Sequence, residues 1–309
     1  MFALTAKDPR EQAAVLALTE ASPGPWYEVA DVVEEAGSAL AIVAGTHTFY
    51  EEPQAILAGK LAERVSQEMI ERWAKVIETT LARSPDTQLV TVLDEDYPRN
   101  LRRIYDRPSF LFVRGTLVED DARSVAVVGT RRASAEGRAL AREMAAALTD
   151  HGVTVISGLA AGIDTEAHAA ALDAGGRTIA VMGTGIDRVY PKENAALAER
   201  IANHGALISQ FWPGSPPRSQ NFPLRNVVTS GVAIGTVVIE ASSTSGAKMQ
   251  ARLALEHGKR LFLVESLVLQ EEWAQRYKSR RGAQVVRGVD EVVEALEAER
   301  EPATELQLF

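Results

Sequence analysis

Three glycine-containing turns stand where the sequence could bind an anion. They occupy residues 129–132, 157–162 and 183–185, and each follows a short run of apolar or β-branched residues. If those runs are consecutive strands of a parallel sheet, the turns share its carboxyl edge, where main-chain amides and helix amino termini converge. A single turn would indicate only tight packing between a strand and a helix, whereas three predict a phosphate-binding edge.

The turns differ from those of a dinucleotide-binding enzyme. None has the G-x-G-x-x-G pattern, and the second strand leads into Ser157 and Gly158, where an acidic residue would bind a ribose. The first turn instead carries Arg131 and Arg132, whose guanidinium groups could bind phosphate oxygens through paired hydrogen bonds. We expect Arg131 to contact the ligand and Arg132 to be a solvated surface charge.

The order and spacing of these turns and of other motifs resemble the DNA-processing protein A family, known as DprA or Smf. The resemblance covers residues 88–265. It is carried by the glycine turns and by three later motifs, which are Ile208-Ser209, Asn221-Phe222-Pro223-x-Arg225-Asn226, and Val238-x-Glu240-Ala241 with Ser245-Gly246. Many motifs in one order are stronger evidence than any one of them alone.

The resemblance implies an extended Rossmann-like domain that forms a homodimer, binds and protects single-stranded DNA in a basic pocket, and loads a RecA-type recombinase in DNA uptake, transformation or recombination. It implies no catalytic step and no cofactor. Arg131, Arg225 and Lys192 are the phosphate contacts it suggests. Phe222 is a candidate stacking platform, because every base offers a π-face to an aromatic ring, but it could equally be buried at a helix start. We expect Tyr190 in the core.

The full set of expected DNA- and phosphate-binding residues is Gly129, Thr130, Arg131, Ser157, Gly158, Gly183, Gly185, Lys192, Phe222, Arg225, Asn226 and Lys248. The chain resembles a divergent member of the family, because several positions depart from its usual pattern, namely Ala161, Gln210, Val227, residues 247–250 and Glu265-Ser266. These changes remove two arginines from the expected pocket. The family's winged helix is not expected at the carboxyl end, since only 20 residues follow Val289.

A second hypothesis, of a different class, is a nucleotide-ligand sensor or a phosphoribohydrolase-like enzyme, because related folds bind nucleotides at the same edge. A hydrolase needs a carboxylate near the sugar, and Glu240 is the candidate, although it lacks the glycine-rich context of similar hydrolases. Asp164 and His168 lie one helical turn apart and could suggest an acid–base or metal pair. We instead expect Asp164 to cap amides at a helix start, and no metal.

The elements that would position these residues follow an α/β pattern. We expect an extended Rossmann-like sheet, mostly parallel with a mixed edge and with helices on both faces. The clearest helix is residues 134–151, where Ser134 can cap the first amides and Gly152 can end the helix. Residues 211–220 are proline-rich and predict an exposed loop. The expected strands are residues 88–93, 110–113, 124–128, 153–156, 178–182, 206–209, 236–239, 260–264 and 283–286.

The chain divides into three expected parts. Residues 1–84 predict a small all-helical domain of the SAM or helix-hairpin type, in which residues 53–82 form one long amphipathic helix. Residues 85–297 predict the DNA-binding domain, and residues 298–309 a flexible acidic tail. Leu306, Leu308 and Phe309 in that tail resemble the peptide by which bacterial proteins dock on the replication sliding clamp, although a frayed terminus is the commoner case.

Composition limits the alternatives. The 309 residues are 46% hydrophobic, enough for one large core, and they include no cysteine, which excludes disulfides, zinc ribbons and thiol nucleophiles. Charged residues near the amino terminus and the lack of a long apolar segment predict a cytoplasmic protein. The net charge of −9 disfavours nucleic acid unless cations are locally concentrated. A basic tract at residues 276–287 could be an accessory DNA surface or the solvated face of a helix.

Overall fold

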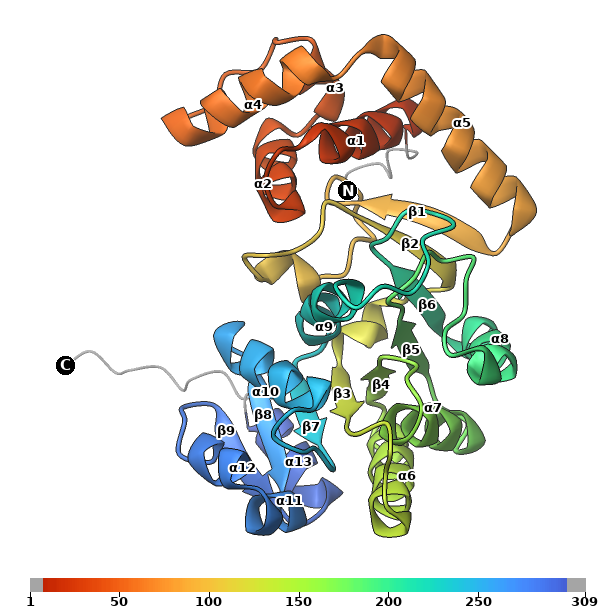
Figure 1. Cartoon of the computed structure of the whole chain (residues 1–309), viewed down its shortest axis with the longest axis vertical. Helices are drawn as coiled ribbons and strands as arrows, with labels where there is room; N and C mark the ends of the chain where they lie inside the picture. The colour runs from red at the N-terminus through yellow and green to blue at the C-terminus, as the bar shows by residue number, and fades with distance from the viewer. Residues whose placement is uncertain (1–7, 299–309) are drawn as a thin grey trace, which may run out of the picture.

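The computed structural model describes residues 8–298, which build a nine-stranded sheet flanked by helices and preceded by a helical region (Figure 1). The sheet order is β1-β2-β6-β5-β4-β3-β7-β8-β9. The expected strands are all present, with ends that differ by one or two residues. Their bounds are β1 Thr87–Thr91, β2 Phe110–Gly115, β3 Ser124–Val128, β4 Thr154–Ser157, β5 Thr178–Val181, β6 Ala206–Ser209, β7 Gly235–Val238, β8 Arg260–Val264 and β9 Ala283–Val286.

The seven strands from β6 to β9 in this order are parallel, and the mixed edge arises because β2 runs antiparallel to both of its neighbours, β1 and β6. The central strands read as continuous apolar runs because both of their faces are covered. In β3 all five residues are buried. The fold class expected from the sequence, a mostly parallel Rossmann-like sheet with a mixed edge, is therefore confirmed.

Helices cover both faces of the sheet. On one face α7 packs between α6 and α8, and on the other α9 packs against α10. Ser134 caps α6 by accepting a hydrogen bond from the Gly137 amide at 2.9 Å, and Gly152 follows the helix with φ +65°. The bounds are α6 Ala135–Asp150, α7 Ile163–Asp173, α8 Ala195–His204, α9 Asn221–Val232, α10 Gly246–Glu256, α11 Glu265–Gln270, α12 Glu272–Tyr277 and α13 Val289–Glu297, with short 3₁₀ helices η1 Leu101–Arg103, η2 Glu119–Ala122 and η3 Lys192–Asn194.

The strand order reverses at β3. From β3 the chain proceeds outward through β4, β5 and β6, then returns to the other side of β3 and proceeds through β7, β8 and β9. The connections that leave β3 and β7 therefore diverge at the carboxyl edge. In open parallel sheets this divergence leaves a crevice in which ligands bind.

The amino-terminal region differs from expectation in one respect. Its helices are α1 Pro9–Ala21, α2 Trp26–Ala36, α3 Ala39–Val43, α4 Glu52–Arg64 and α5 Gln67–Arg83. The prediction of one helix over residues 53–82 was wrong, because the chain breaks after Arg64 and Ser66 caps α5 by accepting from the Met69 amide at 3.3 Å. The apolar spacing continues across the break, so periodicity alone did not reveal it.

An aromatic cluster joins the helical region to the sheet. Trp212 stacks on Phe110 of β2 with ring centroids 4.8 Å apart, and it lies 5.0 Å from Trp26 and 4.4 Å from Trp73. Residues 211–220 contain no helix or strand, as expected. The prediction that this loop is exposed is wrong at its start, because Phe211 is buried and Trp212 is anchored in the cluster. No helix within residues 8–298 is long and apolar enough to cross a membrane.

Candidate functional site

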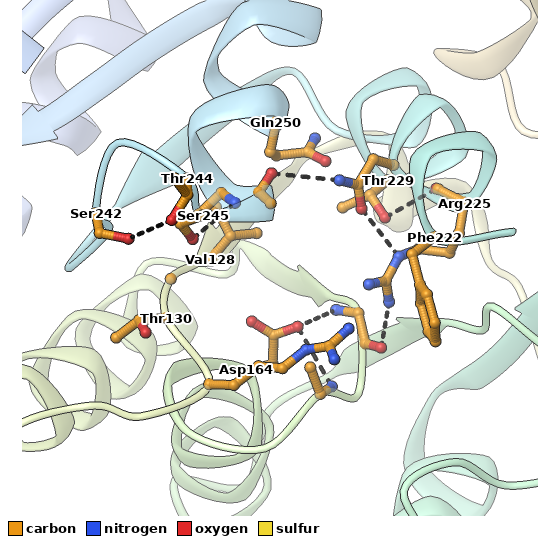
Figure 2. A pocket seen from close by; sticks show the side chains of 17 residues that line it. Val128, Thr130, Asp164, Phe222, Arg225, Thr229, Ser242, Thr244, Ser245 and Gln250 are labelled. Atoms are coloured by element: carbon orange, nitrogen blue, oxygen red, sulfur yellow. Dashed lines mark hydrogen bonds between the residues drawn. The ribbon is translucent and has the colours of Figure 1, made fainter. Parts of the chain in front are cut away.

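A cavity of about 320 Å³ lies at the point where the strand order reverses. Its walls come from the turn after β3, the turn after β4, the start of α9 and the segment between β7 and α10 (Figure 2). The lining residues are Val128, Gly129, Thr130, Arg131, Gly158, Ala160, Asp164, Phe222, Arg225, Asn226, Thr229, Ser242, Thr244, Ser245, Gly246, Ala247 and Gln250.

A second, smaller cavity of about 120 Å³ adjoins the first. It adds the turn after β5, through Gly183 and Thr184, and the side chains of Tyr190 and Pro191. Five residues line both cavities, namely Arg131, Gly158, Ala160, Phe222 and Arg225. All three glycine turns therefore contribute to one continuous site, which we call the switch-point site.

Phe222 stands between the two cavities, at the first turn of α9. Its ring is half-buried and lies 5.0 Å from the guanidinium carbon of Arg131 and 6.0 Å from that of Arg225. Tyr190 lies on its other side with centroids 5.9 Å apart. Gly183 makes room for the ring, since a Cβ there would lie 2.9 Å from Phe222 Cδ1. The ring is thus held at the cavity wall by two cations and a glycine.

Tyr190 is not in the core. The prediction that placed it there was wrong, because 43% of the residue is exposed. Its position beside Phe222 gives the site a second accessible aromatic ring.

Arg131 and Arg225 approach Phe222 from different environments. Arg131 is exposed, and its guanidinium has no hydrogen-bond partner among the described residues. Arg225 is only 6% exposed, and its Nη1 donates to the carbonyl oxygens of Gly158 and, at 2.9 Å, Val181. Burial lowers the pKa of Arg225, and the Asp164 carboxylate opposes that shift. Arg225 therefore ties the ends of β4 and β5 together, whereas Arg131 contacts the Phe222 ring and keeps its N–H donors available to a ligand.

Several amides of the glycine turns are already bonded within the protein. The Thr130 amide donates to Glu240 O at 2.7 Å, and the Gly185 amide donates to Ser215 O at 3.0 Å. The amides of Gly158 and Ala160 both donate to Asp164 Oδ2, at 3.1 and 3.4 Å. The protein's own groups occupy these four donors, whereas the amides of Arg131 and Gly183 have no hydrogen-bond acceptor among the described residues.

Asp164 and His168 act separately. Asp164 caps amides as expected, and burial raises its pKa while Arg225 opposes the rise. His168 is fully buried, and burial lowers its pKa to about 3. Its Nδ1 lies 2.6 Å from Thr178 Oγ1, whose own hydrogen is donated to Val155 O, so Nδ1 carries the histidine proton. Within residues 8–298 no three acidic or histidine side chains are grouped as a metal site requires.

Glu240 does not line the cavity. Its carboxylate accepts hydrogen bonds from the amide of Ser134 at 3.0 Å and from the Ser134 hydroxyl at 2.9 Å. It thereby supports the start of α6 and faces the positive end of that helix. The carboxylate that a phosphoribohydrolase would need near a sugar is committed to the protein itself.

The remaining expected residues fall in two groups. Gly129, Thr130, Gly158, Gly183 and Asn226 line the switch-point site. Four others lie beside it without lining either cavity: Ser157, Gly185, Lys192 and Lys248. The expected clamp-binding residues Leu306, Leu308 and Phe309 lie outside the described residues.

Two of those four residues make contacts that explain their positions. The Ser157 hydroxyl donates to Val127 O at 2.7 Å, which joins β4 to β3. Lys248 Nζ donates to Ser243 O at 3.2 Å, within the segment that precedes α10.

One wall of the site is formed by hydroxyl groups that were not predicted from the sequence. Ser242, Thr244 and Ser245 follow β7 and lie across the cavity from Asp164 and Thr130 (Figure 2). The signal was available, because a serine- and threonine-rich segment after a buried strand often leads into a helix start. Ser245 is such a cap and accepts from the Ala247 amide at 3.1 Å.

Known proteins match this chain in sequence. The family model for DNA recombination-mediator protein A matches residues 88–297. The chain is 40% identical to DNA processing protein DprA of Streptococcus pneumoniae over 58% of its own length and 63% of the relative. It is 40% identical to protein Smf of Escherichia coli over 65% of its length and 55% of the relative. It thus spans little more than half of these curated relatives.

The match to a putative DprA of Mycobacterium tuberculosis is longer, at 33% identity over 87% of this chain and 74% of the relative.

Solved structures agree. The X-ray structure of DprA from S. pneumoniae matches with a TM-score of 0.71 and 29% identity, covering 94% of this chain and 98% of that one. DprA from Helicobacter pylori matches with a TM-score of 0.61 and 24% identity over 69% and 96% of the two chains, which shows the shared fold. From the family model, which covers most of the chain, and from these relatives, we conclude that the chain belongs to the DNA recombination-mediator protein A family.

Proposed function

We propose that the protein binds single-stranded DNA at the switch-point site and serves recombination as a mediator without chemistry of its own. The observation that carries the proposal is the half-buried Phe222 ring with Arg131 beside it, at the opening between two connected cavities. Bases stack on such a ring whatever their identity, and an exposed guanidinium can contact the backbone phosphates. The H. pylori relative is itself described as binding single-stranded DNA.

Each side chain has a distinct part in this proposal. Phe222 stacks against a base, and Arg131 contacts the adjoining phosphate. Arg225 holds the wall behind the ring and presents only Nη2 to a ligand, because Nη1 is bonded to two carbonyls. The hydroxyl groups of Ser242, Thr244 and Ser245 supply neutral hydrogen bonds on the opposite wall.

The absence of catalysis is also part of the proposal. The carboxylates nearest the site are engaged, Asp164 by the amides of Gly158 and Ala160 and Glu240 by Ser134. His168 is buried and is held neutral by its lowered pKa. Asp164 lines the cavity, but its carboxylate accepts the two turn amides, so we expect no general base to act there.

The partners follow from family membership. We propose that the protein acts in the cytoplasm as a homodimer and hands the bound strand to a RecA-type recombinase. We further propose that residues 85–297 form the DNA-binding domain and that residues 1–84 form a separate helical domain.

The test is a titration of labelled single-stranded and double-stranded oligonucleotides at two salt concentrations. We expect tighter binding to the single strand and an affinity that falls steeply with salt, at about 0.7 decades per decade of salt for each phosphate contact. Arg131→Ala should weaken binding and reduce that slope by about 0.7. Arg132→Ala is the matched control, because Arg132 is its exposed neighbour but does not line the site.

Two outcomes would refute the proposal. Equal affinity of Arg131→Ala and Arg132→Ala for the single strand would show that Arg131 does not contact the DNA. Release of free base from nucleoside monophosphates would instead support the hydrolase alternative.

A further inference from the structure

A second basic cavity lies between the helical region and the sheet. Its volume is about 750 Å³, and it is bounded by one face of α5, by the start of β1, by Glu199 of α8 and by two loops. Those loops are residues 186–189, which follow the third glycine turn, and Pro213–Gly214, which follow the anchored Trp212. We call this cavity the α5 groove.

Cations line the α5 groove from the helix side. Arg72, Lys75 and Arg83 lie on the face of α5 that also carries Thr79 and Thr80, spaced three or four residues apart. The acidic Glu71 and Glu78 of the same helix do not line the groove. One helix face therefore combines positive charge with hydroxyl groups, as a phosphate backbone requires.

Of the four cationic side chains that line the groove, two are paired with acids and two are available to a ligand. Arg72 pairs with Glu20, and Arg114 of β2 pairs with Asp86 and Glu199. Lys75 and Arg83 are exposed and have no ion-pair partner within residues 8–298. Two acidic residues line the groove, and both are engaged within the protein. Glu199 accepts hydrogen bonds from Arg114, and the Asp187 carboxylate accepts one from the Gly214 amide at 2.7 Å.

The groove adjoins the switch-point site through two shared segments. Residues 183–191 line the smaller cavity at their two ends, through Gly183 and Tyr190, and the groove in between, through Asp187. The loop that carries Pro213 and Gly214 leads directly into α9, whose second residue is Phe222. The aromatic cluster fixes this loop against the helical region. The two cavities are therefore adjacent, one on each side of residues 183–191.

The segment between the two cavities, residues 183–191, carries one exposed arginine, Arg188. Arg188 is exposed and has no side-chain hydrogen bond or ion pair among the described residues. Arg188 lines neither cavity, but it stands between Asp187 and Val189, which line the groove, so the segment between the two cavities carries a cation without an acidic partner among the described residues.

We propose that the α5 groove is a second binding site for the backbone of the same DNA strand, occupied only when the strand extends beyond the switch-point site. This inference rests on the proposed function and adds a role for the helical region. The ligand class is a single-stranded polynucleotide, recognised through phosphates and not through bases.

The first test varies oligonucleotide length. Wild-type protein and Lys75→Ala/Arg83→Ala are titrated with a short oligonucleotide of about 6 nucleotides, near the lower end of usual site sizes, and a long one of about 20, above their upper end. For the long strand, losing two phosphate contacts should reduce the salt slope by about 1.4 and the affinity at about 0.15 M salt by roughly tenfold. For the short strand the variant should match the wild type.

The matched control is Lys60→Ala/Arg64→Ala on α4, which removes the same charge from the helical region outside the groove. Equal losses for the groove variant and this control would show a general field effect and overturn the proposal. Equal losses on short and long strands would overturn it as well. Two other results would refute the proposed function itself: failure of the wild-type protein to bind the short strand, or full binding of the short strand by Arg131→Ala.

A second measurement does not depend on affinity. The chain contains no cysteine, so Thr79→Cys gives a single attachment point for a thiol-reactive photo-crosslinker in the groove. The labelled protein should crosslink to the long strand and not to the short one. Failure to crosslink to the long strand under conditions of saturated binding would place the strand elsewhere and refute the inference.

Discussion

Replacement of Arg225 by methionine separates a structural role from a direct role in DNA binding. The guanidinium is buried and joins the carbonyls of Gly158 and Val181 through Nη1, while Nε donates to Asn226 Oδ1 at 3.0 Å. Methionine fills a similar volume but donates nothing. Two buried carbonyls would then lose a charged donor, and Asp164 would lose its nearby cation.

The size of the effect follows from opposing contributions. Hydrogen bonds from a charged donor contribute about 1.5–3 kcal/mol each, so two lost bonds would cost about 3–6 kcal/mol. Removing a desolvated charge offsets part of this loss, as the lowered pKa of Arg225 indicates. We expect Arg225→Met to reduce the free energy of unfolding by about 2–4 kcal/mol, which for a chain of this size lowers Tm by about 3–6 °C.

The assay is scanning calorimetry together with a DNA titration below the melting range. Arg131→Met is the matched control, because its exposed guanidinium bonds to no described residue and its loss should leave Tm within about 1 °C of the wild type. A variant at Arg225 that melts like the wild type yet loses DNA binding would refute the reasoning. That result would show that the guanidinium contacts the ligand and does not hold the strands.

Three further predictions concern the same core and site. His168→Gln should lose less stability than the wild type between pH 7 and pH 5 in calorimetry. The neutral histidine stabilises the fold fully above its unfolded pKa of 6.5, and this contribution is lost as pH falls toward 3. Equal losses of stability in His168→Gln and the wild type would show that protonation of His168 does not cause the decline. Gly183→Ala should displace the Phe222 ring and weaken single-strand binding while the circular dichroism stays native, and unchanged binding would count against stacking on this ring. Trp212→Ala should cost about 3–5 kcal/mol in denaturant unfolding, and a cost below about 1 kcal/mol would show that the aromatic cluster does not hold the loop.

The positions of the strands and of the glycine turns that follow them could be predicted from the sequence, because both depend on local patterns. Apolar runs such as residues 124–128 are long enough to identify a buried strand, and the turns that follow them are recognisable by composition. The pairing order of the strands, which creates the crevice between β3 and β7, is not a local property.

The state of individual side chains was less predictable. Arg131 and Arg225 belong to equally suggestive motifs, yet one is exposed and the other is buried against carbonyls. The difference arises because α9 carries Arg225 across the ends of β4 and β5, which only the folded chain brings together. The helix break at Ser66 was missed for the opposite reason, since the apolar repeat hides a local cap.

The carboxylates of Asp164 and Glu240 have a consequence for ligand choice. They occupy helix starts and turn amides where nucleotide-binding sheets hold a phosphate. A free nucleotide that enters this crevice would therefore meet the Asp164 carboxylate at its wall, and its phosphate would find the amides of Gly158, Ala160 and Ser134 already bonded. A polymer, in contrast, can bind through flexible cations spread along the rim. Under the proposed function, these internal acids would keep abundant cellular nucleotides from competing with DNA, so that the protein discriminates by the length of its ligand.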